Sequence, residues 1–110
     1  MVYFVGAGAG AADLITVRGA RLLKEADQII YAGSLVNPEL LRDRKPGCAV
    51  WDSAVMTLEE VMEQVILMER RGGMTVRLHT GDKSIYGAVR DQMDRLEESD
   101  IHFQVCDGVS

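Results

Sequence analysis

The 110-residue chain has few cysteines, no long apolar run and no excess of basic side chains. Its cysteines, Cys48 and Cys106, lie far apart without the spacing of zinc ligands or of a disulfide scaffold, so we expect small buried residues and no metal site. No apolar stretch is long enough to cross a bilayer, which argues against membrane insertion. The net charge of -5 argues against nucleic-acid binding, because such binding requires a basic surface.

The apolar fraction of 47% and the charged fraction of 26% are typical of a soluble globular protein. Met1 leads directly into an apolar run without a basic flank or a cleavage-like site, so we expect no signal peptide and a cytoplasmic location. Residues 1–110 are long enough for one core. Because the sequence stops in a loop just after a predicted strand, where a covering helix would be expected, we interpret it as one domain of a longer protein.

Short apolar runs alternate with helical patterns along the chain, and this alternation predicts an α/β fold. Thr57 and Glu60 have the spacing of a capping box at the start of one helix. We therefore predict a three-layer fold with a five-stranded, mostly parallel sheet and helices on both faces. The strands are expected at 2–5, 28–32, 48–51, 74–79 and 102–106, with helices at about 16–26, around Pro38, from 58 to the glycines at 72–73, and around 89–96.

Two predicted strands end in glycine-containing loops, Gly6-Ala7-Gly8-Ala9-Gly10 and His79-Thr80-Gly81-Asp82. Ligands of parallel α/β sheets bind at the carboxyl ends of the strands, where helix N–H groups converge and glycine lets the backbone approach closely. The two loops therefore predict a small-molecule site at one edge of the sheet.

The first loop also satisfies the dinucleotide pattern G-x-G-x-x-G/A, so a nicotinamide-binding Rossmann domain is an alternative. Two features argue against it: no acid follows the second strand, since Asp27 precedes it, and the helix begins well after the glycines. A tight, closely packed turn is a further interpretation of these glycines.

Several polar residues have more than one interpretation at this stage. Asp82 could cap the following helix. Arg77 and His79 lie on one side of their strand, where neighbours could satisfy them or a ligand could contact them. The cations at 18, 21 and 24 and at 42, 44 and 45 are typical of solvated surface. No catalytic triad or paired-carboxylate motif is present.

The residues just discussed resemble the N-terminal domain of the tetrapyrrole methylase family over almost the whole chain. The matching stretches are Val2–Gly8, Asp13–Gly19, Tyr31–Val36, Met56–Glu60 and Arg77–Asp82. The resemblance is strongest to the branch that methylates ring carbon 11 of precorrin-4 or cobalt-precorrin-4 on the route to cobalamin. It implies a homodimer whose subunits have two α/β domains, with S-adenosylmethionine (SAM) bound between them.

The resemblance also implies the residues of the site. SAM contacts are implied for Ala9, Thr80, Gly81, Asp82, Ile85 and Ser110. The substrate carries several carboxylates, for which Arg18 and Arg77 are candidate partners. Where the family usually has proline, this chain has Ala9, Lys83 and Asp107, and where it has an acid, Ala11. We expect less preorganised loops as a result. We also consider that the 110 residues alone are inactive and act only as a structural or dimerisation module, because half of the cleft would be missing.

Overall fold

The computed structural model describes residues 1–7, 17–31, 41–42, 44–80 and 83–106. Its strands are β1 (Val2–Ala7), β2 (Gln28–Tyr31), β3 (Ala49–Asp52), β4 (Thr75–Thr80) and β5 (Phe103–Cys106). The helices are α1 (Val17–Glu25), α2 (Leu58–Arg70) and α3 (Lys83–Glu98), and the short 3₁₀ helix η3 (Ser53–Val55) lies between β3 and α2.

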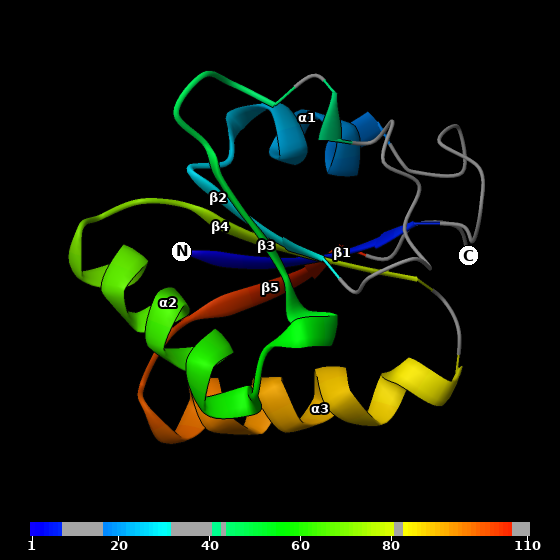
Figure 1. The fold of residues 1–110 in the computed structure, drawn as a ribbon, viewed down its shortest axis with the longest axis vertical. Helices are drawn as coiled ribbons and strands as arrows, with labels where there is room; N and C mark the ends of the chain where they lie inside the picture. Colours follow the sequence, from blue (N-terminus) through cyan, green and yellow to red (C-terminus); the bar gives the residue numbers. More distant parts are fainter. Residues whose placement is uncertain (8–16, 32–40, 43, 81–82, 107–110) are drawn as a thin grey trace.

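The five strands form one sheet in the order β3-β2-β4-β1-β5, and every neighbouring pair is parallel. Helix α1 covers one face of the sheet, and α2 and α3 cover the other (Figure 1). The predicted three-layer α/β fold with helices on both faces is therefore confirmed.

Alternation along β1 separates two hydrophobic cores. Val5 faces α1, whereas Val2 and Phe4 face α2 and α3, as expected for a strand whose successive side chains point to opposite faces. The core on the α1 side comprises Val5, Leu22, Leu23, Ala26, Ile29, Val76 and Leu78. The core on the other side comprises Val2, Phe4, Ile30, Val61, Met62, Val65 and Leu96. A strand buried on both faces needs apolar residues at consecutive positions, which explains the short apolar runs of the sequence.

Helix α2 has the ends that its sequence predicts. The Thr57 hydroxyl accepts from the Glu60 N–H at 3.1 Å, and the Glu60 carboxylate accepts from the Thr57 N–H at 2.9 Å. The predicted capping box is confirmed. At the other end, Gly72 has a φ of 76° and Gly73 donates to the carbonyl of Met68 at 3.1 Å. This is a Schellman ending, which requires the left-handed conformation that glycine adopts at low cost.

Some predicted boundaries were wrong by one or two residues. Strand β1 extends through Gly6 and Ala7, because it pairs with β4 as far as Ala7 opposite Thr80. Pairing with β4 thus outweighs the tendency of Gly6 to end a strand. The third strand begins at Ala49 and the fifth at Phe103. The short helix predicted around Pro38 and the cap predicted at Thr16 lie outside the described residues.

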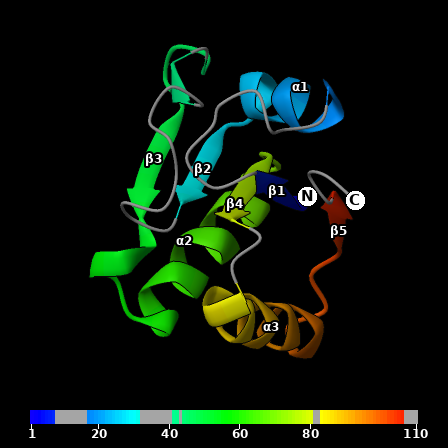
Figure 2. The ribbon, with the colours of Figure 1, turned by 90° about the vertical axis from the view of Figure 1, so that its right-hand side faces the viewer.

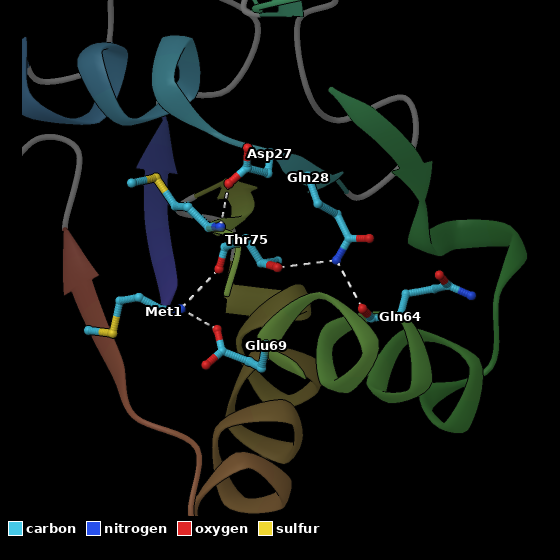
Figure 3. A network of polar contacts seen from close by, with 8 residues as sticks. Met1, Asp27, Gln28, Gln64, Glu69 and Thr75 are labelled. Carbon is cyan, nitrogen blue, oxygen red and sulfur yellow. Dashed lines mark hydrogen bonds and ion pairs between the residues drawn. The ribbon is translucent and has the colours of Figure 1, made fainter. Parts of the chain in front are cut away.

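A polar network joins the amino-terminal ends of β1, β2 and β4 (Figure 3). Buried Gln28 donates to the Thr75 hydroxyl and to the carbonyl of Gln64, both at 3.2 Å, and accepts from the Trp51 indole at 3.1 Å. The amino group of Met1 contacts the Glu69 carboxylate. These contacts occupy the edge of the sheet opposite to the predicted site, and we assign them a structural role.

Asp27 belongs to the same edge and supports a prediction about pH. Its carboxylate pairs with Lys45 and accepts from the Met74 N–H at 2.7 Å, and these two contacts lower its pKa below the usual 3.8. The stabilisation is therefore present above about pH 4 and is lost as the pH falls through the folded-state pKa. Since the pair is partly exposed, Asp27→Asn should lower the free energy of unfolding by at most about 1 kcal/mol at pH 7.

Urea unfolding at pH 7 and pH 3 measures this difference. The exposed residue Asp91 on α3 offers a matched control, because Asp91→Asn should change stability little at either pH. An Asp27→Asn effect that is as large at pH 3 as at pH 7 would contradict the assigned contacts.

Candidate ligand site at the carboxyl edge of the sheet

The strand order creates a topological switch point between β1 and β4. The chain leaves β1 toward α1 on one face, and it leaves β4 toward α3 on the opposite face (Figure 1). The last residues of these strands, Ala7 and Thr80, are partners in the register. In open parallel sheets such a divergence of two loops leaves a crevice where ligands bind.

Strand β5 adds a third strand end to this region. It lies on the other side of β1, so that β4, β1 and β5 follow one another across the sheet (Figure 2). Its last residue, Cys106, is the partner of Val5. The chain therefore leaves three adjacent strands at one edge, and the segments that follow them, at 8, 81 and 107, contain most of the predicted cofactor contacts.

Two of the residues with predicted SAM contacts belong to described elements. Thr80 is the last residue of β4, and Ile85 is the third residue of α3. Only residues 81 and 82 separate this strand from this helix, so the first turn of α3, whose N–H groups have no acceptor within the helix itself, lies at the carboxyl edge. Ala9, Gly81, Asp82 and Ser110 lie outside the described residues, and the SAM contacts of all six residues stay predictions.

Arg18 lies at the surface near the beginning of α1. Its guanidinium donates from Nη2 to the Gln104 side-chain oxygen at 2.8 Å, an exposed bond that links α1 to β5. Gln104 is the partner of Tyr3 in the sheet register. Both partners of this bond are exposed, and the predicted substrate contact of Arg18 stays a prediction.

Arg77, by contrast, is buried, with only 3% of its surface exposed. Its Nε donates to the Gln92 side-chain oxygen at 2.9 Å, and its Nη1 donates to the carbonyls of Leu78 at 2.8 Å and Ile30 at 3.4 Å. Burial lowers the pKa of Arg77 to about 10, so the guanidinium is still protonated at pH 7. Direct contact between Arg77 and a substrate stays a prediction, and these contacts favour a role inside the fold.

The sequence left open whether neighbouring residues or a ligand contact the side chain of Arg77, and the structure shows contacts with neighbours. Arg77 lies on the α3 side of β4, whereas Val76 and Leu78 pack on the α1 side, as strand alternation predicts. Neighbours accept three hydrogen bonds from its Nε and Nη1. Gln92 was missed at the sequence level, although a signal existed: it is a polar residue within the helical stripe of Val89, Met93 and Leu96.

Other candidate sites contribute little. Cys48 is partly buried against the core, as expected, and burial raises the pKa of its thiol. The described residues contain no cluster of His, Cys, Asp and Glu that could hold a metal ion. Among the same residues, no helix combines the length and apolar character needed to cross a membrane. A shallow groove of about 410 Å³ lies over α2 and α3, but no strand end lines it.

Comparison with known proteins identifies the family of this chain. The family model for Tetrapyrrole (Corrin/Porphyrin) Methylases matches residues 1–110. The chain is 47% identical over 109 residues to the cobalt-precorrin-4 C(11)-methyltransferase of Methanocaldococcus jannaschii, covering 99% of the chain and 42% of that protein. It is 46% identical to the precorrin-4 C(11)-methyltransferase of a Sinorhizobium species, with 98% and 43% covered.

Solved structures of similar proteins have the same fold as this chain. A cobalamin biosynthetic enzyme, cobalt precorrin-4 methyltransferase, superimposes with a TM-score of 0.90 at 43% identity, over 99% of this chain and 46% of that one. The uroporphyrin-III C-methyltransferase of Thermus thermophilus, complexed with S-adenosylhomocysteine, has a TM-score of 0.78 at 31% identity, over 99% and 45%. The chain thus spans less than half of the length of these relatives. Because the family model matches residues 1–110 and a solved member of similar sequence has the same fold, the chain belongs to the tetrapyrrole methylase family.

Proposed function

We propose that the protein containing this chain is a SAM-dependent methyltransferase of cobalamin biosynthesis that methylates ring carbon 11 of precorrin-4 or cobalt-precorrin-4. Residues 1–110 would form one of two α/β domains in each subunit of a homodimer and supply one side of the SAM site. The sequence does not distinguish the cobalt-free from the cobalt-containing substrate, because the similar proteins include enzymes named for each.

One structural observation carries this proposal. The carboxyl ends of β4, β1 and β5 are adjacent, with Ala7 opposite Thr80 and Val5 opposite Cys106. The segments with the proposed SAM contacts, at Ala9, Gly81-Asp82 and Ser110, therefore begin directly after three neighbouring strands. A relative of the same fold has been solved with S-adenosylhomocysteine, the product that SAM leaves after methyl transfer.

The residues at this edge fit an adenosyl sulfonium compound in their chemistry. Gly6 and Ala7 end β1 with little side-chain volume. The N–H groups of the first turn of α3, which have no acceptor within the helix, lie at the same edge and could donate to the carboxylate of the methionine part of SAM. When bound, SAM supplies an electrophilic sulfonium methyl group. The contribution of the chain is alignment, since holding reactants in line can correspond to an effective molarity of about 10⁵ M or more. We propose that Asp82 positions the cofactor and does not remove a proton.

Arg18 is the proposed contact for a substrate carboxylate. Its guanidinium is exposed near the start of α1, and it already donates to a neutral acceptor, Gln104, which a carboxylate could replace with a stronger bond. A KM for the tetrapyrrole that is the same in Arg18→Gln as in the wild type would exclude this contact.

Titration calorimetry tests the cofactor assignment. The protein as its gene encodes it is expected to bind SAM and S-adenosylhomocysteine and to give no heat with NAD. Binding of NAD without SAM would support the dinucleotide interpretation of the first loop. The same titration on residues 1–110 alone separates a competent half-site, which binds SAM, from a module with only a structural or dimerisation role, which does not.

A further inference from the structure

The buried guanidinium of Arg77 connects three elements of the fold. Within one side chain, Nε donates to Gln92 on α3, while Nη1 donates to carbonyls of β4 and β2. The bonds to Gln92 and to Leu78, at 2.9 and 2.8 Å, have ordinary hydrogen-bond lengths, whereas the bond to Ile30, at 3.4 Å, is long. The planar guanidinium thus fixes α3 mainly against the strand that precedes it.

Stability alone does not explain an arginine at this position. Within the described part of the chain, none of the ion pairs involves Arg77. Burying a charge costs several kcal/mol, and apolar residues of similar volume often replace buried charges with no loss of stability. What an apolar residue cannot supply is a rigid set of directional donors. The value of the guanidinium at this place therefore lies in the geometry that it imposes.

The two elements that Arg77 mainly joins, β4 and α3, follow one another in the chain with only two residues between them. Residue 77 lies three positions before the end of β4, and Gln92 lies in the middle of α3. Only residues 81 and 82 connect the two elements. The position of α3 relative to β4 decides where the first turn of this helix lies at the carboxyl edge of the sheet. The Arg77–Gln92 bond thus helps to fix the place of that first turn.

We propose that Arg77 and Gln92 are positioning residues that hold α3 against β4 and thereby keep the first turn of α3, which includes Ile85, in place for SAM. This inference rests on the proposed function, since it takes the first turn of α3 as part of the cofactor site. Arg77 acts through the backbone and through Gln92, and it needs no contact with the cofactor.

The test replaces Gln92, which leaves the buried charge of Arg77 and its carbonyl contacts in place. In the protein as encoded by its gene, Gln92→Leu is expected to raise the dissociation constant of SAM about tenfold. In the ligand-free protein it should speed amide hydrogen exchange at residues 87–91 of α3 severalfold. Gln92→Glu should restore both values, because a carboxylate accepts from Nε at least as well. Gln92→Asn, which is too short to make the bond, is measured alongside in case the leucine variant does not fold.

Gln28 offers a matched control at the opposite edge of the sheet. It is also a buried glutamine, 2% exposed compared with 7% for Gln92, and its side chain likewise bridges a strand and a helix (Figure 3). Gln28→Leu should lower the melting temperature by an amount similar to that for Gln92→Leu and leave SAM affinity unchanged.

The two readouts separate failure of this inference from failure of the proposed function. A Gln92→Leu protein that is less stable but has wild-type SAM affinity and wild-type exchange in α3 would overturn the positioning role. Equal losses of affinity in Gln28→Leu and Gln92→Leu would do the same. A wild-type protein that binds no SAM would refute the proposed function, while the exchange comparison would still decide whether Gln92 holds α3 in place.

Discussion

Replacement of Phe4 by alanine is expected to lower the free energy of unfolding by about 3–5 kcal/mol. Phe4 is 1% exposed and is the largest fully buried side chain among the described residues. It packs among residues of the sheet, α2 and α3, including Ile30 and Met62. Truncation removes this apolar burial and leaves a cavity that several elements would have to fill. Because domains of this size are stable by about 5–15 kcal/mol, the variant should be marginally folded.

Denaturant unfolding with Phe103→Ala as the matched control measures this effect. The two rings meet edge to face with centroids 5.5 Å apart, but Phe103 lies on the edge strand β5 and is only partly buried. The same chemical change should therefore cost less at position 103. A larger loss at position 103 than at position 4 would contradict the assigned core.

The largest functional effect is expected at Asp82, for which we propose contact with SAM. Asp82→Asn should raise the dissociation constant of SAM about 10- to 100-fold, since interactions with a charged group contribute about 1.5–3 kcal/mol. S-adenosylhomocysteine has no sulfonium charge, so its affinity should fall less. Turnover at saturating SAM should stay within a few-fold of the wild type, because a positioning residue adds little once the cofactor is bound.

The comparison of the two ligands makes this experiment specific. Asp91→Asn, an exposed substitution further along α3, is the control and should leave both affinities unchanged. Loss of turnover with intact SAM binding would show that Asp82 takes part in the chemical step, and the positioning role would then be wrong. Equal losses for SAM and for S-adenosylhomocysteine would exclude attraction to the sulfonium charge.

Much of the fold could be predicted from the sequence because its signals are local. The capping box of Thr57 and Glu60 involves residues three apart, and the alternation of Val2, Phe4 and Val5 needs only the geometry of one strand. From the sequence, the candidate site could be predicted only as far as the edge of the sheet, since ligands of parallel sheets bind at the carboxyl ends of the strands, where the glycine loops follow. The assignment to a family with SAM came from resemblance and not from the physical pattern.

Contacts between distant segments could not be predicted in this way. Gln92 and Arg77 are 15 residues apart, and Gln28 and Thr75 are 47 apart. Each pairing depends on how a helix and a strand, or two strands, are brought together by packing. A polar residue within an apolar stripe indicates that some partner exists but does not say which one.

The sequence by itself determined the succession of strands and helices, the parallel sheet and the family, because periodicity, caps and motifs depend on near neighbours in the chain. Only the tertiary structure decided that β1 lies between β4 and β5, which brings the carboxyl ends of three strands together at one edge. It also decided that Arg77 faces the interior while Arg18 stays at the surface. The physical reason is that strand order and burial follow from the packing of the whole chain, and one residue type can satisfy its donors in either environment.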